Sequence, residues 1–548
     1  MMEKKIIAHF IKRSQNSISL ILVTGVFTVG VITCKINNES NNGEIIINIS
    51  QSKTGSNGMC GSVTAPYLLD LGSATIRDRI GNSHISITTN SEKAQEWFDQ
   101  GLCLLHDFWS FEAYRSFLES VKSDSLCPMP YWGIALSLPN GIEEVKDIRK
   151  NAIKNCHKLR GNANPFENDL IIMLDFLGEN FDLEGLKVYM DKLYRKYPDN
   201  NEITLLYLHV LFWMGNSEFN AMKKITENGI QTNPKNISLA HYYIHIMERT
   251  EEYEKALPQV KLILDYHPNV AHLFHSTGHI YFRMGELYRA IDVFKKADSF
   301  DQSYHKNEGI SYIENEQYLH NLHYLAISLL ENNNISDAMI VARRYADLQF
   351  ASSRKSARTA LMWNYEGVIL PAIIQMRIRN WGGAIYELQN IVNMTYGIQN
   401  KALLEVEALL FFCKGMQSLE SADIKLAVEN IQLLTQKLDQ IEKNINNNKD
   451  FGSYLSFNLL QCLYIYAYEL QGWIKNMDVS KPFDFSDFTM GLEIEKNIGY
   501  TEPPKMLYSV YESMALLLEL RGDVKESEKF FKKACLSRKG SKLIKNCK

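Results

Sequence analysis

Histidines in this chain recur at a fixed interval. Adding 34 to the position of His241 gives His275, and adding 34 to that of His245 gives His279. A period of 34 is that of one helix-turn-helix repeat, and such repeats bury their apolar faces only by stacking on one another. The spacing therefore predicts an all-α solenoid of helical hairpins, with these histidines at equivalent places on successive helices.

Prolines and small residues mark the same repeat. Pro198, Pro234 and Pro268 recur at spacings of 36 and then 34, and each is expected to separate two hairpins because proline cannot continue a helix. Within one unit, small residues allow close helix approach and aromatic residues fill the gap between hairpins. The members of this tetratricopeptide-like pattern are Phe274, Gly278, Tyr281, Ala290, Phe294 and Ala297.

The same order of residues recurs near both ends of the helical part. It consists of Trp97, Gly101, Ala113 and Phe117 near the start, and of Tyr511, Ala515, Phe531 and Ala534 near the end. Between them, residues 348–500 have helical periodicity but a less regular repeat. We therefore predict a repeat solenoid with a histidine-lined groove over residues 87–347, and a helical repeat region over 348–548 that ends in a tetratricopeptide-like hairpin.

The N-terminal residues have the pattern of a targeting segment. Lys4, Lys5, Lys12 and Arg13 precede an apolar run at 18–32, which is typical of an export signal and short for a membrane span. Residues 1–34 are thus predicted to be an export signal or membrane anchor, with Cys34 as a candidate for lipidation. Residues 35–86 are predicted to be a flexible tether, since 35–65 is rich in Asn, Ser and Gly. The expected location is exported, periplasmic or membrane-associated, with membrane contact only through the N-terminus.

Composition excludes several functions. With 59 basic and 63 acidic side chains the formal charge is −4, so a broad nucleic-acid-binding surface is not expected. The 9 cysteines include no CxxC pair, and no phosphate-binding loop, HExxH or GxSxG motif occurs. No catalytic residue is predicted, and an enzyme is the less favoured interpretation.

Several blocks resemble one family. They are Phe98-Asp99-Gln100-Gly101-Leu102, Tyr131-Trp132-Gly133-Ile134-Ala135-Leu136, His241-Tyr242-Tyr243-Ile244-His245, His272-Leu273-Phe274-His275-Ser276-Thr277-Gly278-His279, His320-Asn321-Leu322-His323 and Glu502-Pro503-Pro504. Together they resemble bacterial exported tetratricopeptide-repeat proteins with histidine-rich repeats. The resemblance implies an α-solenoid and no particular activity. Trp109-Ser110 stands where that family has an Asn-His pair, so a role for a histidine in the first hairpin is in doubt.

The histidine spacing suits metal binding. Histidines three or four residues apart share one face of a helix, so each pair can hold one ion, and imidazole and carboxylate are good ligands for zinc, copper or nickel. The predicted metal ligands are His241, His245, Glu248, His275, His279 and His323. The predicted groove-binding residues are Tyr242, Arg249, His272, Arg283, His320 and Tyr324. For each histidine the alternative is a structural hydrogen bond to the neighbouring hairpin.

Two functions remain open at this point. The favoured one is a repeat scaffold whose concave groove takes a peptide, protein segment or small ligand. The alternative is a metal-binding protein or metal-dependent hydrolase, with zinc, copper or nickel as cofactor. Convergence of three ring nitrogens on one point would favour the metal. In an open groove, histidines at their ordinary pKa would protonate below about pH 6.5, and the binding of a cation or metal ion would weaken there.

Overall fold

The computed structural model describes residues 72–138, 143–178, 181–312, 315–350, 358–393, 400–447, 457–506, 508–545 and 547. Within these ranges the regular structure is helical and no strand occurs. The predicted export signal, Cys34 and most of the predicted tether lie outside them. No helix among the described residues is long and apolar enough to span a membrane.

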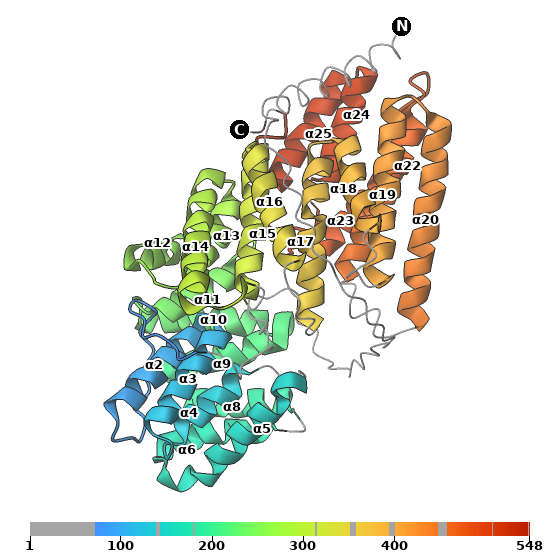
Figure 1. The fold of residues 1–548 in the computed structure, drawn as a ribbon. Helices are drawn as coiled ribbons and strands as arrows, with labels where there is room; N and C mark the ends of the chain where they lie inside the picture. Colours follow the sequence, from blue (N-terminus) through green and yellow to red (C-terminus); the bar gives the residue numbers. More distant parts are fainter. Residues whose placement is uncertain are drawn as a thin grey trace, which may run out of the picture.

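The first half of the fold is a run of short hairpins, blue to green in Figure 1. Several of its helices begin at a residue whose side chain accepts a hydrogen bond from a free backbone N–H group of the first turn. One of them, α6 (Pro165–Ile171), also has a proline in the first turn, where no N–H partner is needed. The helices of this half are α2 (Glu92–His106), α3 (Ser110–Ser123), α4 (Met129–Ser137), α5 (Glu143–Lys158), α6 (Pro165–Ile171), α7 (Met173–Phe176), α8 (Leu183–Lys196), α9 (Asn201–Met214), α10 (Phe219–Thr232), α11 (Ile237–Met247), α12 (Leu257–Tyr266) and α13 (Ala271–Met284).

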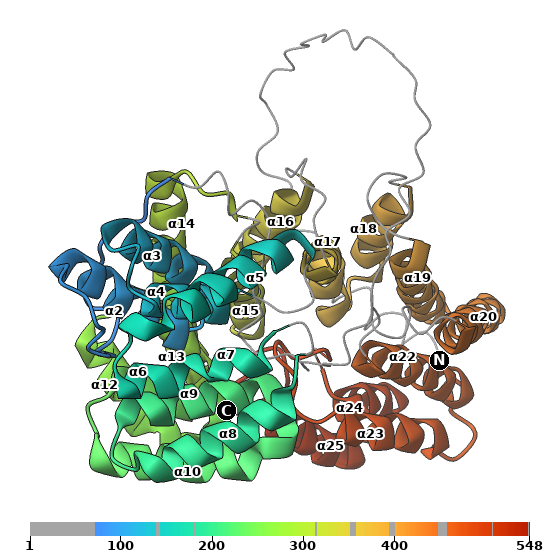
Figure 2. The ribbon, with the colours of Figure 1, turned by 90° about the horizontal axis from the view of Figure 1, so that it is seen from below.

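The second half has longer helices, which follow one another in chain order from α14 to α20 in Figure 2. The 22 residues of α14 include the extra length that separates the last histidine block from the one before it. These helices are α14 (Leu287–Glu308), α15 (Glu316–Glu331), α16 (Ile335–Phe350), α17 (Arg358–Arg377), α18 (Trp381–Asn393), α19 (Asn400–Glu420), α20 (Ile424–Asn447), α22 (Phe457–Asn476), α23 (Ser486–Ile498), α24 (Val510–Arg521) and α25 (Val524–Ser537).

A phenylalanine ring packs against a glycine of the preceding helix in two hairpins, as the repeat pattern predicts. A Cβ atom on Gly278 of α13 would collide with the ring of Phe294 on α14. A Cβ on Gly101 of α2 would lie 2.6 Å from the ring of Phe117 on α3. Each aromatic ring therefore fills the place where any other residue would carry a side chain. The fold is an α-solenoid of tetratricopeptide-like hairpins.

Two apolar cores meet at α17. One core runs from Ile80 to Ile374 and the other from Tyr365 to Ile544, so buried residues of this one helix belong to both. The predicted boundary at residue 347 lies within α16, most of whose buried residues belong to the first core. Since both cores share α17, no linker separates the two halves there among the described residues.

The predicted tether ends earlier than residue 86. Ile80 and Ile85 are buried, the backbone N–H of Arg77 donates to Gln100 at 2.8 Å, and Gly81 exchanges hydrogen bonds with the Tyr266 hydroxyl. The apolar residues scattered between 74 and 87 have no helical or strand period, so sequence reasoning assigned them to the tether. They pack as an irregular segment across α2 and α12.

The C-terminal residues return to the histidine-bearing hairpins. A Cβ on Gly540 would collide with the backbone of Gly285, so the two glycines touch through their backbones. The segment between α23 and α24 carries Tyr500 and Glu502, which reach α11. Glu502-Pro503-Pro504 belongs to this segment, and α24 begins only at Val510.

Candidate metal centre

Three helices bring the clustered histidines together. α11 carries His241 and His245, the neighbouring α13 carries the next three, and α15 packs on the other side of α13. Every one of these side chains is buried, so they line the interior of the solenoid and not an open groove. The difference arises because neighbouring hairpins and the returning C-terminal segment cover the face that the period alone would leave open.

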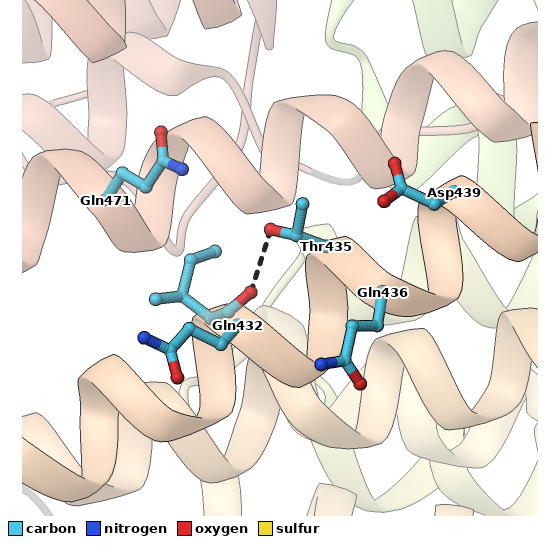
Figure 3. A pocket seen from close by; sticks show the side chains of 6 residues that line it. Gln432, Thr435, Gln436, Asp439 and Gln471 are labelled. Atoms are coloured by element: carbon cyan, nitrogen blue, oxygen red, sulfur yellow. Dashed lines mark hydrogen bonds between the residues drawn. The ribbon is translucent and has the colours of Figure 1, made fainter.

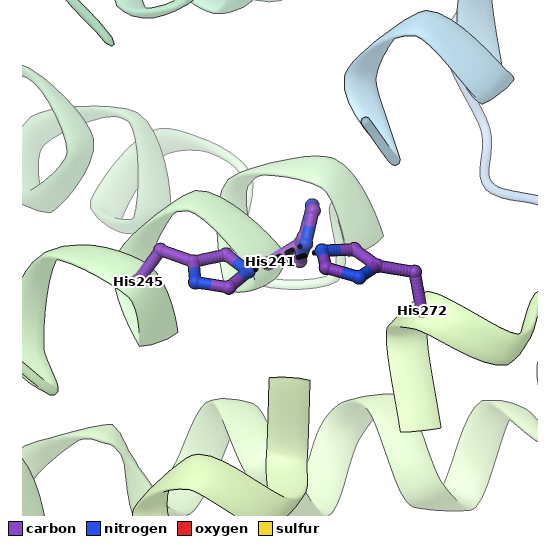
Figure 4. Close-up of side chains that lie close together, drawn as sticks. All are labelled: His241, His245 and His272. Atoms are coloured by element: carbon purple, nitrogen blue, oxygen red, sulfur yellow. Dashed lines mark hydrogen bonds between the residues drawn. The ribbon is translucent and has the colours of Figure 1, made fainter. Parts of the chain in front are cut away.

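His241, His245 and His272 form a first histidine group (Figure 4). The Nε2 atom of His245 lies 3.0 Å from Nε2 of His241 and 3.3 Å from Nε2 of His272. Two nitrogen ligands at about 2.0–2.1 Å from one ion are separated by about 2.9 to 3.4 Å, depending on the angle between them. These two separations are those of ligands around one ion, and one ring nitrogen of each of the three residues falls within 4.8 Å of the others.

His275, His279 and His320 form a second histidine group. Nε2 of His279 lies 2.7 Å from Nε2 of His275, and the His320 ring lies 4.8 Å from the His275 ring, centroid to centroid. One ring nitrogen from each of the three residues falls within 4.8 Å of the others. This group repeats the residue pattern of the first one on the next pair of helices, with one Nε2–Nε2 separation shorter than that of two ligands at about 2.0–2.1 Å from one ion.

The outer ring nitrogens fix the tautomers. Nδ1 of His241 lies 3.0 Å from the carbonyl oxygen of His106, which can only accept, so this Nδ1 carries the proton. Nδ1 of His275 lies 2.9 Å from Oδ1 of Asn321, and the Asn321 amide is oriented by its own Nδ2 donating to the Phe294 carbonyl. In the neutral rings both Nε2 atoms therefore present lone pairs toward the centre of their group.

Glu248, the C-cap residue of α11, serves both groups. Its Oε1 accepts from Nδ1 of His245 at 2.8 Å, and its Oε2 accepts from Nδ1 of His279 on the next hairpin. A carboxylate that holds the outer nitrogen of a histidine orients the ring and makes the inner nitrogen a better ligand. The two facing pairs, His241 with His245 and His275 with His279, thus each expose two unprotonated Nε2 atoms at close range.

A second carboxylate, Glu502, lies beside Glu248. Burial raises the pKa of Glu248 to about 7 and that of Glu502 to about 8, and the hydrogen bond between the two carboxyl groups adds to the shift at Glu502. The hydroxyl of Tyr500 donates to Glu248 at 3.3 Å, and Arg249 lies 3.9 Å from Glu502. His245, Glu248, His279 and Glu502 also meet within 4.8 Å, which makes a third set of potential ligands.

Burial keeps the histidines neutral. It lowers the pKa of His241 to about 3 and that of His279 to about 4. The pKa values of His245, His272, His275 and His320 are lowered well below the ordinary value by burial and by the neighbouring histidines. The prediction of ordinary imidazole pKa values depended on an open groove, and burial overturns it.

An aromatic ring covers each group. The Phe108 ring lies 4.8, 5.5 and 6.0 Å from the rings of His241, His245 and His272. The Tyr324 ring lies between 4.5 and 5.6 Å from the three rings of the second group. Phe108 has φ at 60°, a left-handed conformation that is costly for a bulky residue. This conformation places the Phe108 ring over the first group.

Some histidines predicted to bind a groove ligand belong to the histidine groups, and one predicted metal ligand does not. His272 and His320, predicted to bind a groove ligand, are members of the two groups. His323, predicted as a metal ligand, lies outside them with its Nδ1 3.6 Å from Glu366. The three-residue spacing of His320 and His323 puts both on one side of α15, and only packing decides which one faces α13.

The remaining predicted groove residues are not free contacts. The hydroxyl of buried Tyr242 lies 3.1 Å from Nδ1 of His209, and buried Tyr324 covers the second group. Arg283 is partly buried, donates to the Glu248 carbonyl and lies over the Tyr500 ring at 4.9 Å. These side chains surround the histidine groups and do not offer a surface to a peptide.

Sequence reasoning missed four parts of the site. They are the backbone carbonyl of His106, the Phe108 ring, the Asn321 side chain and Glu502. Asn321 lies inside a histidine block and Glu502 inside a block of the family resemblance, so a signal for both was present. Nothing in the local sequence connects residues 106–108 with α11, because that contact joins segments far apart in the chain.

A depression on the surface lies elsewhere. It is formed by α20 and α22 and is lined by Ile431, Gln432, Thr435, Gln436, Asp439 and Gln471 (Figure 3). Three amides, a hydroxyl and a single carboxylate give it no cluster of metal ligands or nucleophiles. The histidine groups therefore remain the candidate site.

Comparison with known proteins gives structural likeness at a low level. No protein-family model matches the chain, and no curated protein matches it. A chain in the crystal structure of the APC/C hetero-tetramer Cut9–Hcn1 is 13% identical with a TM-score of 0.32, over 83% of this chain and 76% of that chain. A human IFIT1 dimer with PPP-AAAA gives 13% identity and a TM-score of 0.31, over 79% of this chain and 89% of that chain. Likeness at this level carries no functional assignment.

Proposed function

We propose that this helical-repeat protein binds a transition metal in its histidine groups. The observation that carries the proposal is the pair of facing Nε2 atoms of His275 and His279, 2.7 Å apart, whose Nδ1 atoms both lie against acceptors. When Glu248 is ionised, two neutral rings held this way turn lone pair toward lone pair, and a cation between them relieves the repulsion. A transition-metal ion is the cation that imidazole nitrogens prefer.

The site favours holding an ion over hydrolysis. A hydrolytic metal keeps an open position for water and substrate. Here Phe108 and Tyr324 cover the two groups, and the ring nitrogens lie in the interior. The proposed role is therefore that of a metal-binding protein, with zinc, copper and nickel as the candidate ions.

Binding of a peptide or protein segment in a concave groove, and export from the cell, stay predictions. The helical-repeat body is the kind of scaffold that often binds such segments. Of the residues predicted to make those contacts, Tyr242, His272, His320 and Tyr324 are buried, and Arg249 and Arg283 are partly buried. The geometry for that reason supports metal better than it supports a peptide at this place.

Metal content tests the proposal. The purified full chain would be incubated with zinc, copper or nickel, passed over a desalting column and measured by plasma mass spectrometry. We expect bound metal that is lost in the His241→Ala/His275→Ala variant, which removes one ligand from each group. The matched control is His84→Ala/His157→Ala, since both of these side chains are at least partly exposed and lie outside the groups. Equal metal content in the two double variants, or none in the unmutated chain, would refute the proposal.

A further inference from the structure

The two histidine groups are copies of one another, one hairpin apart. Two of the three members recur at a spacing of 34 and the third at 48, which absorbs the extra length of α14. A single ion would need only one group, so a duplicated group with the same three positions points to two ions. The corresponding residues are His241 and His275, His245 and His279, and His272 and His320.

The two groups are also neighbours. The His272 ring lies 5.6 Å from the His275 ring, and the His245 ring lies 5.7 Å from the His279 ring. One carboxylate, Glu248, holds a ligand of each group by a different oxygen. Glu248 therefore orients one ring in each group.

Charge favours monovalent ions. Each group offers three neutral ring nitrogens in the interior, and the cost of moving an ion out of water rises with the square of its charge. The two carboxylates beside the histidines, Glu248 and Glu502, can supply at most two negative charges, and Arg249 lies 3.9 Å from Glu502. Two monovalent ions would match these two charges, whereas two divalent ions would carry twice as much.

Coordination number points the same way. Zinc in proteins takes four ligands, and the fourth would have to be water or a further side chain. The Phe108 ring covers the first group and the Tyr324 ring covers the second. Copper(I) is the monovalent transition-metal ion that accepts three imidazole nitrogens without a fourth ligand.

We propose that the two histidine groups form a paired site for two copper(I) ions, one in each group, with Glu248 as the residue that positions both. This inference rests on the proposed function and specifies its metal and its stoichiometry. In each occupied group the ion lies among three ring nitrogens. Glu248 touches no ion and acts through His245 and His279.

Counting copper tests the pairing. The full chain would be titrated with copper(I) under anaerobic, reducing conditions against bicinchoninate, a coloured chelator that competes for this ion. We expect two copper ions per chain, and one in each of the variants His241→Gln and His320→Gln, which remove a ligand from different groups. X-ray absorption on the unmutated, copper-loaded chain should show three nitrogen neighbours per copper, a result that needs no variant to fold.

Positioning variants test the role of Glu248. Glu248→Gln should weaken both copper ions by about 10- to 100-fold, because one ligand of each group loses its carboxylate partner. Asn321→Leu should weaken a single copper ion, because Asn321 holds only His275. Glu366→Gln is the matched control and should leave both copper ions bound, since Glu366 lies beside His323, which belongs to neither histidine group.

Each failure has its own meaning. Absence of copper, zinc and nickel alike overturns the proposed function together with this inference. One copper per chain, or four neighbours per copper, overturns the paired site and leaves metal binding standing. Loss of metal in Glu502→Gln would make Glu502 a ligand, and zinc retained against an excess of copper(I) would show a site for a divalent ion. Either result would overturn the inference.

Discussion

His275 and His279 face each other through their Nε2 atoms at 2.7 Å, one turn apart on α13. Their Nδ1 atoms lie against the oxygen atoms of Asn321, on the helix that follows α14, and of Glu248, at the end of α11. These hydrogen bonds turn the two rings, four residues apart on one helix, so that their Nε2 atoms face each other. This arrangement and the packing around it lead to four predictions, each with its own measurement.

Metal should stabilise the folded chain. An ion that binds only the folded state at a free concentration one hundred times its dissociation constant adds about 2.7 kcal/mol. We expect the melting temperature of the unmutated chain to rise on addition of copper(I), measured by differential scanning calorimetry. His279→Gln should rise less and His84→Ala should rise as much as the unmutated chain. Equal rises in all three chains would contradict the prediction.

Gly278→Ala should loosen the hairpin that carries the second group. The added methyl group would collide with the Phe294 ring, and overpacking of this kind costs about 1–3 kcal/mol. Urea unfolding followed by circular dichroism measures the loss. The control is Gly161→Ala, where a Cβ meets nothing within 4 Å. A Gly278→Ala variant as stable as the control would show that α13 and α14 separate without cost.

Arg377→Met should destabilise the junction between the two cores. The buried Arg377 guanidinium donates to Glu331 at 2.8 Å and to Glu512 at 2.9 Å, so its removal leaves two buried carboxylates without the cation that is hydrogen-bonded to them. Breaking a buried pair this way costs about 3–5 kcal/mol. Arg343→Met is the control, because its side chain is 54% exposed in its pair with Glu387 and an exposed pair contributes about 0–1 kcal/mol. Urea midpoints of the two variants should differ accordingly.

Asp301→Asn should stabilise the chain as the pH rises. Burial raises the pKa of Asp301 from 3.8 to about 8, so between these values the folded state holds a proton that the unfolded state has lost. Stability is therefore lost as the pH rises toward the folded-state pKa, and the Asn variant, which keeps an oxygen for the Nδ2 of Asn315, avoids this loss.

The advantage of that variant should be small at pH 5 and reach about 2 kcal/mol or more at pH 8. Melting temperatures across this range measure it. Asp292→Asn on the exposed side of the same helix is the control and should show no such trend. A constant difference between pH 5 and 8 would mean that Asp301 ionises in the folded chain as it does in the unfolded one.

The hairpin architecture was predictable because it depends on local regularities. The contacts of Gly278 with Phe294 and of Gly101 with Phe117 follow from the repeat pattern, and the structure has both. The pairing of His241 with His245 and of His275 with His279 follows from four-residue spacing on a helix. The predicted tether was too long, because an irregular segment that packs without a period leaves no pattern to detect.

The membership of the two groups was only partly predictable. Spacing could not say whether His320 or His323 faces α13, and the structure turns His320 inward and leaves His323 beside Glu366. Glu502 comes from a segment far beyond α13 in the chain, and Phe108 from a turn far before it. Contacts across such distances have no signature in the local sequence.

The sequence by itself determined the period, the helices and the histidine pairs that share a helix face, because each depends on residues a few positions apart. The tertiary structure alone decided that the histidines are buried, that three from two helices converge twice, and that Glu248 joins the two groups. These features depend on how distant segments pack, and packing also sets the pKa of each ring and which of its nitrogens holds the proton. The chemistry of the site is in that sense a property of the folded chain.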